Sequence, residues 1–298
     1  MPDLIDICMC SDFNYLKPTV VAINSLLSNT KYNNNFIRIN ILCDNFKTKD
    51  ELENLLKKIK TKFPKIILRN SLFIASIKLK ELIKKITINK KSKKLGCYKI
   101  NTNISNYSRF YFKEHFSDLG RIIYLDSDIL VLGDIYNLYK LHDSKLSRKK
   151  YINSYFIAYD RKRDNSTYYN WNHKGLIEYK DVLKKKGTYF NAGIYLTDLN
   201  NWVKNDIVNK IEKCIENNVT DENTVMYLSG TEPPLNIIFH DAGKLDKIWN
   251  YTPKKKEDPE NVCKNAKILH FKGPLKPWLN NGNRMSSNYG KRWRFYLK

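Results

Sequence analysis

The sequence predicts an α/β protein of the doubly wound type, a Rossmann-like, mostly parallel sheet with helices on both faces. Apolar, β-leaning runs alternate with helical runs over residues 4–70, as they do in strand–helix–strand units. Of the 298 residues, 42% are hydrophobic and 13% are aromatic, which is enough for a sizeable core.

The N-terminal part of the predicted sheet comes from strands that alternate with helices. Residues 4–10 form a short β-leaning run, and a helix from about 18 to 28 follows, with Pro18 in the first turn where proline is tolerated. The next elements are a strand over 36–43, a helix over 49–62 and a strand over 65–70.

The remaining elements are more widely spaced. Residues 76–94 are rich in lysine and have weak helical spacing, which indicates a solvated surface helix and loop. Residues 105–117 form a plausible amphipathic helix that leads into an apolar strand over 121–132. The later elements are a buried strand over 188–199, a helix over 201–218 and a short strand over 266–269.

The chain is expected to be one domain, 1–298, made of consecutive functional parts. These parts are a nucleotide-binding half (1–142), an insertion with short elements of its own (143–188), a donor and acceptor half (189–278) and a basic aromatic tail (279–298). The tail mixes basic and aromatic residues, so it could rest on an acidic membrane surface or form the last helix of the fold.

The charge of the chain favours anionic partners. Its 53 Lys+Arg against 30 Asp+Glu give a net charge of +23, which attracts nucleotides, phosphorylated sugars, nucleic acid or acidic membranes. The lysine excess comes with many Asn and Ile residues, a bias that an AT-rich genome also produces, so charge alone says little about nucleic-acid binding.

The start of the chain does not resemble a signal peptide and no run is long enough to span a membrane, which predicts a cytoplasmic or peripheral membrane protein. The six cysteines lack a CxxC repeat and are expected to be reduced, mostly buried thiols.

The most informative motif is Asp126-Ser127-Asp128, directly after the apolar run 122–125. In doubly wound sheets the ligand crevice lies at the carboxyl ends of the strands. Two carboxylates there can bind a hard divalent cation through oxygen. Without a cation, two like charges in an apolar crevice would raise each other's pKa or destabilise the fold. The alternative is a strand-end turn with exposed carboxylates, and the apolar residues on both sides favour the metal site.

A second cluster follows the apolar strand 266–269. His270 is therefore also expected at a strand end, Gly273 allows a close backbone approach, and Lys276 can contact diphosphate oxygens as a point charge. An isolated histidine is more often structural than a ligand, but histidine, glycine and lysine together suit a metal with a bound phosphate.

Several blocks of the sequence resemble glycosyltransferase family 8. LDSDILVLGDI, YFNAGIYLTDLNNW and HFKGPLKPW are similar to the three signature blocks of that family, and DICMCSDFNYLKPTVVAINSLL and YSRFYF also fit. These blocks run in the right order from about Ile5 to Trp278. The resemblance implies a GT-A fold and a retaining transfer of glucose or galactose from a UDP-sugar, with Mn²⁺, or alternatively Mg²⁺, as cofactor.

The resemblance also implies roles for individual residues. The implied metal ligands are Asp126, Asp128 and His270. The implied donor-binding residues are Met9, Ser11, Asp12 and Tyr15 at uracil and ribose, Arg109 at phosphate or sugar, Ser127 within the carboxylate motif, Asn191, Ala192 and Gly193 along the sugar, and Gly273 and Lys276 around the diphosphate. The ring of Tyr15 would stack on the base.

Asp221 and Glu222 stand where the family usually has Asp-Gln, beside the reacting sugar. Glu222 could be a covalent nucleophile, or it could stabilise an oxocarbenium-like state while the acceptor attacks from the leaving-group side. The second role is favoured, because a family that normally keeps an amide there cannot depend on a carboxylate. Asp221 would then bind sugar hydroxyls.

Three functions follow from these observations. The leading one is a UDP-sugar-dependent hexosyltransferase acting on a glycan, lipid-linked or protein acceptor. The others are a catalytically weak glycan-binding scaffold and a basic nucleic-acid-binding protein. The nucleic-acid function gives the two carboxylates no role, so no nucleic-acid partner is expected.

Overall fold

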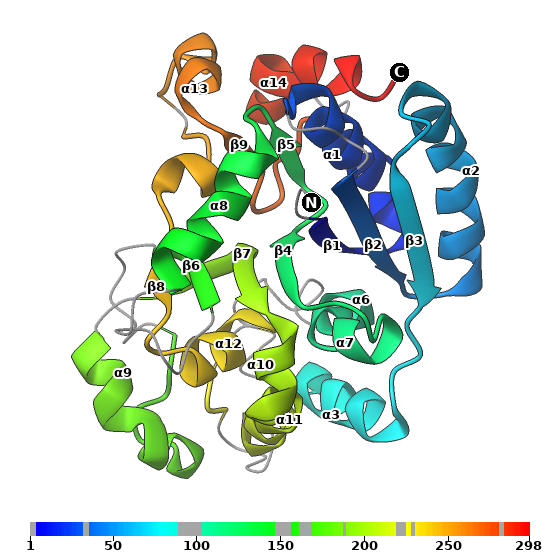
Figure 1. Cartoon of the computed structure of the whole chain (residues 1–298). Helices are drawn as coiled ribbons and strands as arrows, with labels where there is room; N and C mark the ends of the chain where they lie inside the picture. The colour runs from blue at the N-terminus through cyan, green and yellow to red at the C-terminus, as the bar shows by residue number, and fades with distance from the viewer. Residues whose placement is uncertain are drawn as a thin grey trace.

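A mostly parallel central sheet forms the body of the molecule (Figure 1). The computed structural model describes residues 4–31, 36–88, 103–146, 156–160, 168–186, 189–218, 225–227, 230–254, 256–279 and 283–298. Within these residues, seven strands pair in the order β3-β2-β1-β4-β7-β6-β8. Their bounds are β1 Ile5–Ser11, β2 Ile37–Cys43, β3 Ile67–Leu72, β4 Arg121–Leu125, β6 Phe156–Asp160, β7 Phe190–Asp198 and β8 Gly243–Lys244.

The predicted parallel character of the sheet is confirmed. β1 pairs in parallel with β2 and β4, β2 with β3, and β6 with β8. β7 runs antiparallel to both of its neighbours, β4 and β6. Because β7 is reversed, its N-terminal end lies at the same edge of the sheet as the carboxyl ends of β1 and β4.

Helices cover both faces of the sheet and form a separate core on each. Alternate residues of β1 point to opposite faces, as the period of a strand requires. Ile5, Ile7 and Met9 pack with α1 (Leu16–Asn29), α2 (Phe46–Lys62) and α8 (Ile135–Leu146). Cys8 packs on the other side with α3 (Ile77–Ile88), α7 (Phe112–His115), α10 (Leu199–Lys204), α11 (Ile207–Asn218) and α12 (Glu232–Ile238). This arrangement is the predicted doubly wound fold.

The other elements are short. They are η1 Phe13–Tyr15, α6 Ile104–Tyr107, η3 Ser108–Phe110, η6 Lys174–Tyr179, α9 Lys180–Lys186, η7 Lys247–Asn250, α13 Pro259–Asn265 and α14 Arg284–Phe295. The segment expected as an insertion, 143–188, contributes β6 to the central sheet in addition to η6 and α9.

Three predicted elements are interrupted. The apolar strand expected over 121–132 is two strands, β4 and β5 (Ile129–Val131), and β5 pairs with β9 (Ile268–His270) in a separate two-stranded sheet. The helix expected over 105–117 is divided into α6, η3 and α7. The helix expected over 201–218 is divided into α10 and α11 at Asp206, whose φ of 54° is in the left-handed region and ends a regular helix.

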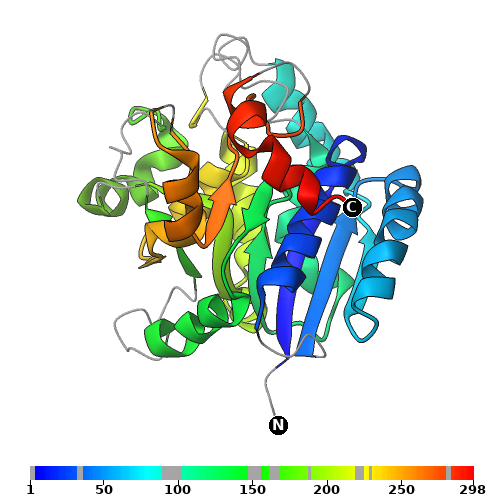
Figure 2. The same cartoon turned by 90° about the horizontal axis from the view of Figure 1, so that it is seen from above.

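The C-terminal helix is docked on the body of the protein. α14 lies beside α1 (Figure 2), and its Tyr289 and Trp293 are buried against Val21 and Phe271. Nδ2 of Asn24 also donates to the backbone oxygen of Tyr296 (2.7 Å). The end of the chain therefore forms the last helix of the fold.

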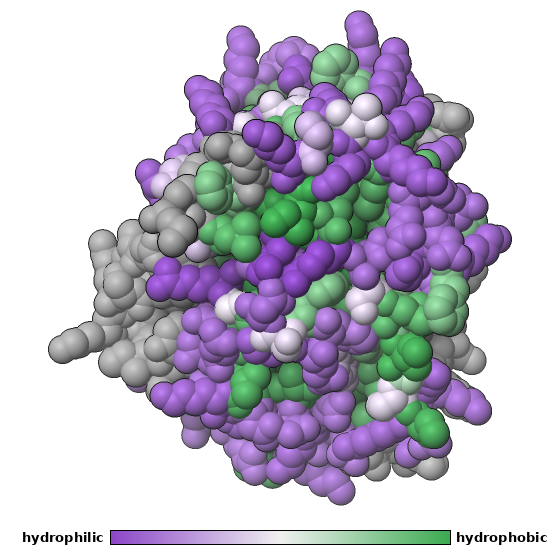
Figure 3. Space-filling model, turned by 45° about the vertical axis from the view of Figure 1, so that its right-hand side comes forward, coloured by the Kyte–Doolittle hydropathy of each residue, from purple (hydrophilic) through white to green (hydrophobic). Residues whose placement is uncertain are grey.

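The face that includes α2 and β3 is largely hydrophilic with separate apolar patches (Figure 3), in agreement with the lysine-rich exposed side of α2. Among the described residues, no helix is long and apolar enough to cross a bilayer. The five cysteines that the structure describes are free thiols, as expected.

Candidate active site

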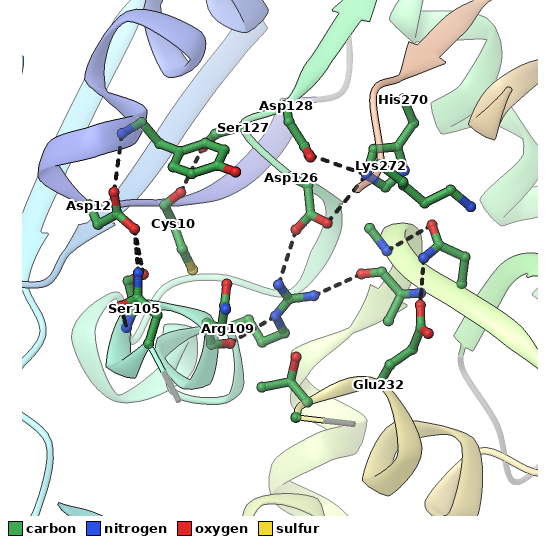
Figure 4. A pocket seen from close by; sticks show the side chains of 18 of the residues that line it. Cys10, Asp12, Ser105, Arg109, Asp126, Ser127, Asp128, Glu232, His270 and Lys272 are labelled. Carbon is green, nitrogen blue, oxygen red and sulfur yellow. Dashed lines mark hydrogen bonds and ion pairs between the residues drawn. The ribbon is translucent and has the colours of Figure 1, made fainter. Parts of the chain in front are cut away.

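A cavity of about 410 Å³ opens at the carboxyl ends of β1 and β4, where the fold class places ligands (Figure 4). Its walls come from β1, β4, β7, the loop after β9 and the segment around α6 and η3. Most of the expected site residues line it: Asp12, Tyr15, Arg109, Asp126, Ser127, Asp128, Asn191, Ala192, Gly193, His270, Gly273 and Lys276.

Strand pairing brings the two carboxylates and the imidazole together. The amide of Asp126 donates to the carbonyl of Gly193 on β7 (2.7 Å), and the carbonyl of Asp128 accepts from the amide of Phe271 (2.9 Å). In addition, β5 places Ile129 opposite His270 on β9. As a result, one ligand atom from each of Asp126, Asp128 and His270 lies within 4.8 Å of the others. The predicted convergence of these three side chains is present in the fold.

Positive and hydroxyl groups hold Asp126 from one side. Its Oδ1 accepts from Nη2 of Arg109 (3.1 Å) and from the hydroxyl of Tyr124 (3.0 Å). The guanidinium also donates to the carbonyl of Ala192 (3.0 Å) and lies over the ring of Tyr124. The other oxygen of Asp126, Oδ2, lies 3.6 Å from Nε2 of His270 and faces the centre of the cluster.

Asp128 is held by Lys276. Its Oδ2 accepts from Nζ of Lys276 (2.6 Å), and its Oδ1 lies 3.2 Å from Nε2 of His270. Burial opposes ionisation of Asp128, but the charges and hydrogen bonds of His270 and Lys276 outweigh burial and hold its pKa well below the usual value. Burial likewise disfavours the charged form of Lys276, yet Asp128 raises the pKa of this lysine. A carboxylate and an ammonium group therefore face each other at this site.

A buried chain of amides orients His270. Its Nδ1 lies 2.8 Å from Oδ1 of Asn250, and Nδ2 of Asn250 donates to Oδ1 of Asn191 (2.8 Å). Asn250 is fully buried, so the contact is not shared with solvent. Because an amide oxygen accepts only from a protonated nitrogen, this contact places a proton on Nδ1. Nε2, which faces the carboxylates, is therefore the nitrogen that could bind a cation after losing its own proton.

The donor set fits a divalent cation. Carboxylate oxygens and one imidazole suit Mn²⁺, and oxygen-rich sites also suit Mg²⁺. The space beside the ligands depends on Gly193, since a Cβ there would lie 2.2 Å from Cε1 of His270 and 2.6 Å from Oδ2 of Asp126. The absence of a side chain at this position keeps the ligand atoms accessible from β7.

Asp12 organises the far end of the cavity. Its Oδ1 accepts from the amides of Asn14 (2.8 Å) and Tyr15 (3.1 Å), and Asn103 donates to its Oδ2. Tyr15 packs edge-on against Trp278, with ring centroids 5.9 Å apart. This end combines an aromatic face with amide and hydroxyl groups.

Two expected donor-binding residues lie behind the cavity wall. Met9 is fully buried in the core between β1 and its helices. The hydroxyl of Ser11 bonds to that of Thr19 (2.9 Å), and Thr19 in turn bonds to the hydroxyl of Ser127 (2.9 Å). The side chains of Met9 and Ser11 therefore support the wall from inside. Asp221 and Glu222 lie outside the described residues, so their roles stay predictions.

Sequence reasoning missed Glu232 and Asn250. Glu232 begins α12 and lines the cavity, where its Oε1 accepts from Nδ2 of Asn191 (2.5 Å) and from the amide of Ala192 (3.0 Å). The only sequence signal for Glu232 is its position before Pro233-Pro234, since prolines are common in the first turn of a helix. Asn250 lies in η7, and no motif distinguishes it from the many other asparagines of the chain.

Comparisons with known proteins agree with the fold described above. The sequence model of glycosyl transferase family 8 matches residues 6–282. Probable galacturonosyltransferase-like 4 of Arabidopsis thaliana is 28% identical over 289 residues, with 93% of this chain and 74% of that protein covered. Human glycosyltransferase 8 domain-containing protein 1 is 29% identical over 186 residues, with 58% of this chain and 50% of that protein covered. The crystal structure of the galactosyltransferase LgtC in complex with donor and acceptor sugar analogs has a TM-score of 0.63 at 19% identity, over 98% of this chain and 95% of that chain.

Proposed function

Because the chain belongs to glycosyltransferase family 8 and has the GT-A fold of its structural neighbours, we propose a specific reaction for this glycosyltransferase. It transfers a neutral hexose, glucose or galactose, from UDP to a glycan, lipid-linked or protein acceptor, with retention of configuration. Mn²⁺ is the proposed cofactor and Mg²⁺ the alternative. Since the Arabidopsis relative is named probable galacturonosyltransferase-like, a UDP-uronic acid is the competing donor class.

The convergence of Asp126, Asp128 and His270 within one cavity supports this proposal most directly. A nucleotide diphosphate carries its charge on the phosphates, and a cation held by two carboxylates and an imidazole neutralises that charge. Lys276 lies beside Asp128 and adds a second positive group. The +23 charge of the whole chain attracts the same anionic donor over a longer range.

The order of groups along the cavity matches the order of groups in a UDP-sugar. Figure 4 shows Asp12 and Glu232 on opposite sides of the carboxylate pair. The aromatic and amide groups near Asp12 suit a nucleoside, and the ligand cluster suits the diphosphate. Asn191, Ala192 and Gly193 then border the place of the sugar.

In the proposed reaction, different residues stabilise the departing UDP, fix the carboxylates and position the sugar. A bound cation supplies Lewis-acid stabilisation of the departing UDP. Lys276 supports the same charge, Arg109 fixes Asp126, and the walls on β7 hold the sugar so that an acceptor hydroxyl can be aligned with the anomeric carbon. Phosphate oxygens can take the acceptor's proton, so the scheme needs no dedicated protein base. The buried side of α14 packs on the body of the protein, and we propose that its exposed side, with Lys291 and Arg294, makes a peripheral contact with an acidic membrane.

Donor hydrolysis with an Asp128 variant tests the proposal. We expect the protein with Mn²⁺ to release UDP slowly from UDP-glucose or UDP-galactose without acceptor. We expect Asp128→Asn to lose this activity by roughly hundredfold or more, because one charged ligand is gone and the remaining groups are misplaced. Released UDP is measured in a coupled assay, with unchanged circular dichroism as the control for folding. Full activity of Asp128→Asn, or full activity of the wild type in excess EDTA, would remove the metal assignment.

A further inference from the structure

We propose that the hydroxyl of Thr19 is a positioning group, which holds the carboxylate motif 126–128 at a fixed place relative to the nucleoside end of the cavity. The inference rests on the proposed UDP-sugar function and adds a residue that acts from behind the cavity wall. Thr19 lies near the start of α1 and is fully buried, so its hydroxyl is shielded from water.

Oγ1 of Thr19 lies where two segments of the cavity wall meet. It is 2.8 Å from the carbonyl oxygen of Tyr15 and 2.9 Å from Oγ of Ser127. The single proton of this hydroxyl can be donated to either oxygen, and Ser11, 2.9 Å away, can supply a further proton. One buried hydroxyl therefore joins the loop after β1, which carries Tyr15, to the motif, of which Ser127 is the middle residue.

Ser127 is the part of the motif that faces the protein interior. Its Oγ donates to the carbonyl of Cys10 at the end of β1 (2.7 Å), and Figure 4 shows the two residues side by side. Ser127 is only 6% exposed. Because Asp126 and Asp128 are its direct neighbours in the chain, the position of Ser127 determines where both carboxylates leave the backbone.

The nucleoside end is organised from the same helix start. The amide of Tyr15 donates to Oδ1 of Asp12 (3.1 Å), and the ring of Tyr15 packs against Trp278. Asp12, Tyr15 and Ser127 all line the cavity. A contact that holds Tyr15 and Ser127 together therefore sets the distance between the two ends of the cavity.

Other contacts fix α1 without reaching the motif. Oγ of Ser25 accepts from the amide of Val131 (3.0 Å), and Nδ2 of Asn29 donates to the carbonyl of Val131 (3.0 Å). Both contacts are made at the end of β5, beyond the carboxylates. Among the described residues of α1, Thr19 is the one whose side chain bonds to the motif itself.

This geometry has a consequence for how a cation and a nucleotide bind together. A UDP held at the nucleoside end must bring its diphosphate to a cation held by the motif, so both ends have to keep their spacing. Without the hydroxyl of Thr19, each end can still bind its own ligand, but the two ligands support each other less. Thr19 therefore contributes to the coupling between cation and nucleotide.

The test measures the factor by which saturating Mn²⁺ tightens UDP binding to the full chain, by titration calorimetry. We expect a factor of roughly tenfold or more for the wild type. Thr19→Val keeps the shape of the side chain and removes the hydroxyl, so this factor should fall by roughly five- to tenfold. Uridine, which has no diphosphate, should bind both proteins alike. Thr19→Ser keeps the hydroxyl and should restore the wild-type factor.

Thr48→Val is the matched control. Thr48 is a fully buried threonine of α2, and its hydroxyl has no hydrogen-bond partner among the described residues. We expect this variant to keep the wild-type factor. Ser127→Ala removes the other half of the contact and should lower the factor as Thr19→Val does, and the double variant should lose no more than either single one.

The inference is overturned if Thr19→Val keeps the wild-type factor, if Thr19→Ser does not restore it, or if Thr19→Val weakens uridine as much as UDP with Mn²⁺. If Thr19→Val does not fold, Ser127→Ala decides, and an unchanged factor in that variant overturns the inference. Failure of Mn²⁺ to tighten UDP binding to the wild type would instead overturn the proposed function.

Discussion

At the scale of single residues, the candidate site consists of three proposed metal ligands and the buried groups that contact them. Asp126 and Asp128 could be predicted because they come just after the apolar run of β4, and ligands bind at the carboxyl ends of strands in this fold class. His270 could be predicted from its place at the end of an apolar run, although β9 pairs with β5 and is not part of the central sheet. Asn250 and Glu232 could not be predicted in this way. Their partners come from distant parts of the chain, and nothing local in the sequence requires a polar group at either position.

Gly193 offers a sharp test of how closely the site is packed. A Cβ at this position would lie 2.2 Å from Cε1 of His270, so Gly193→Ala must displace the imidazole or the strand. We expect donor turnover to fall by roughly hundredfold, since small misplacements of a catalytic centre have effects of this size. Gly120→Ala is the control, because its added Cβ would meet only the side chains of Asn200 and Asp198. Equal turnover in the two variants would contradict the assignment of β7 to the site.

Asn250 is expected to act through His270. Asn250→Ala removes the acceptor of Nδ1, so the imidazole loses its fixed orientation and tautomer. We expect the affinity for Mn²⁺ in the presence of UDP to fall by roughly ten- to hundredfold, as measured by titration calorimetry. Asn265→Ala, at an exposed position in α13, should keep the wild-type affinity. An unchanged affinity in Asn250→Ala would show that the amide has no part in orienting the ligand.

At the scale of elements, the interruptions of the predicted strands and helices create the site. The run 121–132 appears continuous in sequence because apolar residues flank the carboxylates on both sides. In the structure the chain leaves one sheet at Leu125 and enters another at Ile129, so the residues between them face the cavity. Strand propensity cannot show with which other strand a segment will pair, because pairing depends on distant segments such as β7 and β9.

The docking of α12 on β7 can be tested through Asn236. Its side-chain amide satisfies both the N–H and the C=O of Phe190 in a buried position. Asn236→Ala removes both of these buried hydrogen bonds, so we expect the free energy of unfolding to drop by about 1–3 kcal/mol. Urea denaturation measures the change. The exposed Asn209→Ala should shift stability by less than about 0.5 kcal/mol, and a similar shift for both variants would argue against a docking role.

At the scale of the whole molecule, fold class was the most predictable property. The alternation of strands and helices specifies parallel units, and the helices on both faces follow from it. The reversal of β7 and the small β5–β9 sheet were not predictable, since apolar runs carry no information about direction. These two features bring β7 and β9, from the second half of the chain, beside β4 and β5 in the first half.

The central claim is that one cation is held jointly by Asp126, Asp128 and His270. The most direct measurement is a crystal structure with Mn²⁺ and UDP, with anomalous diffraction data collected at the manganese absorption edge. The account predicts an anomalous peak at bonding distance from both carboxylates and from Nε2 of His270, with the diphosphate on its open side. Manganese bound elsewhere, or UDP bound in the cavity with His270 turned away from the carboxylates, would contradict the account.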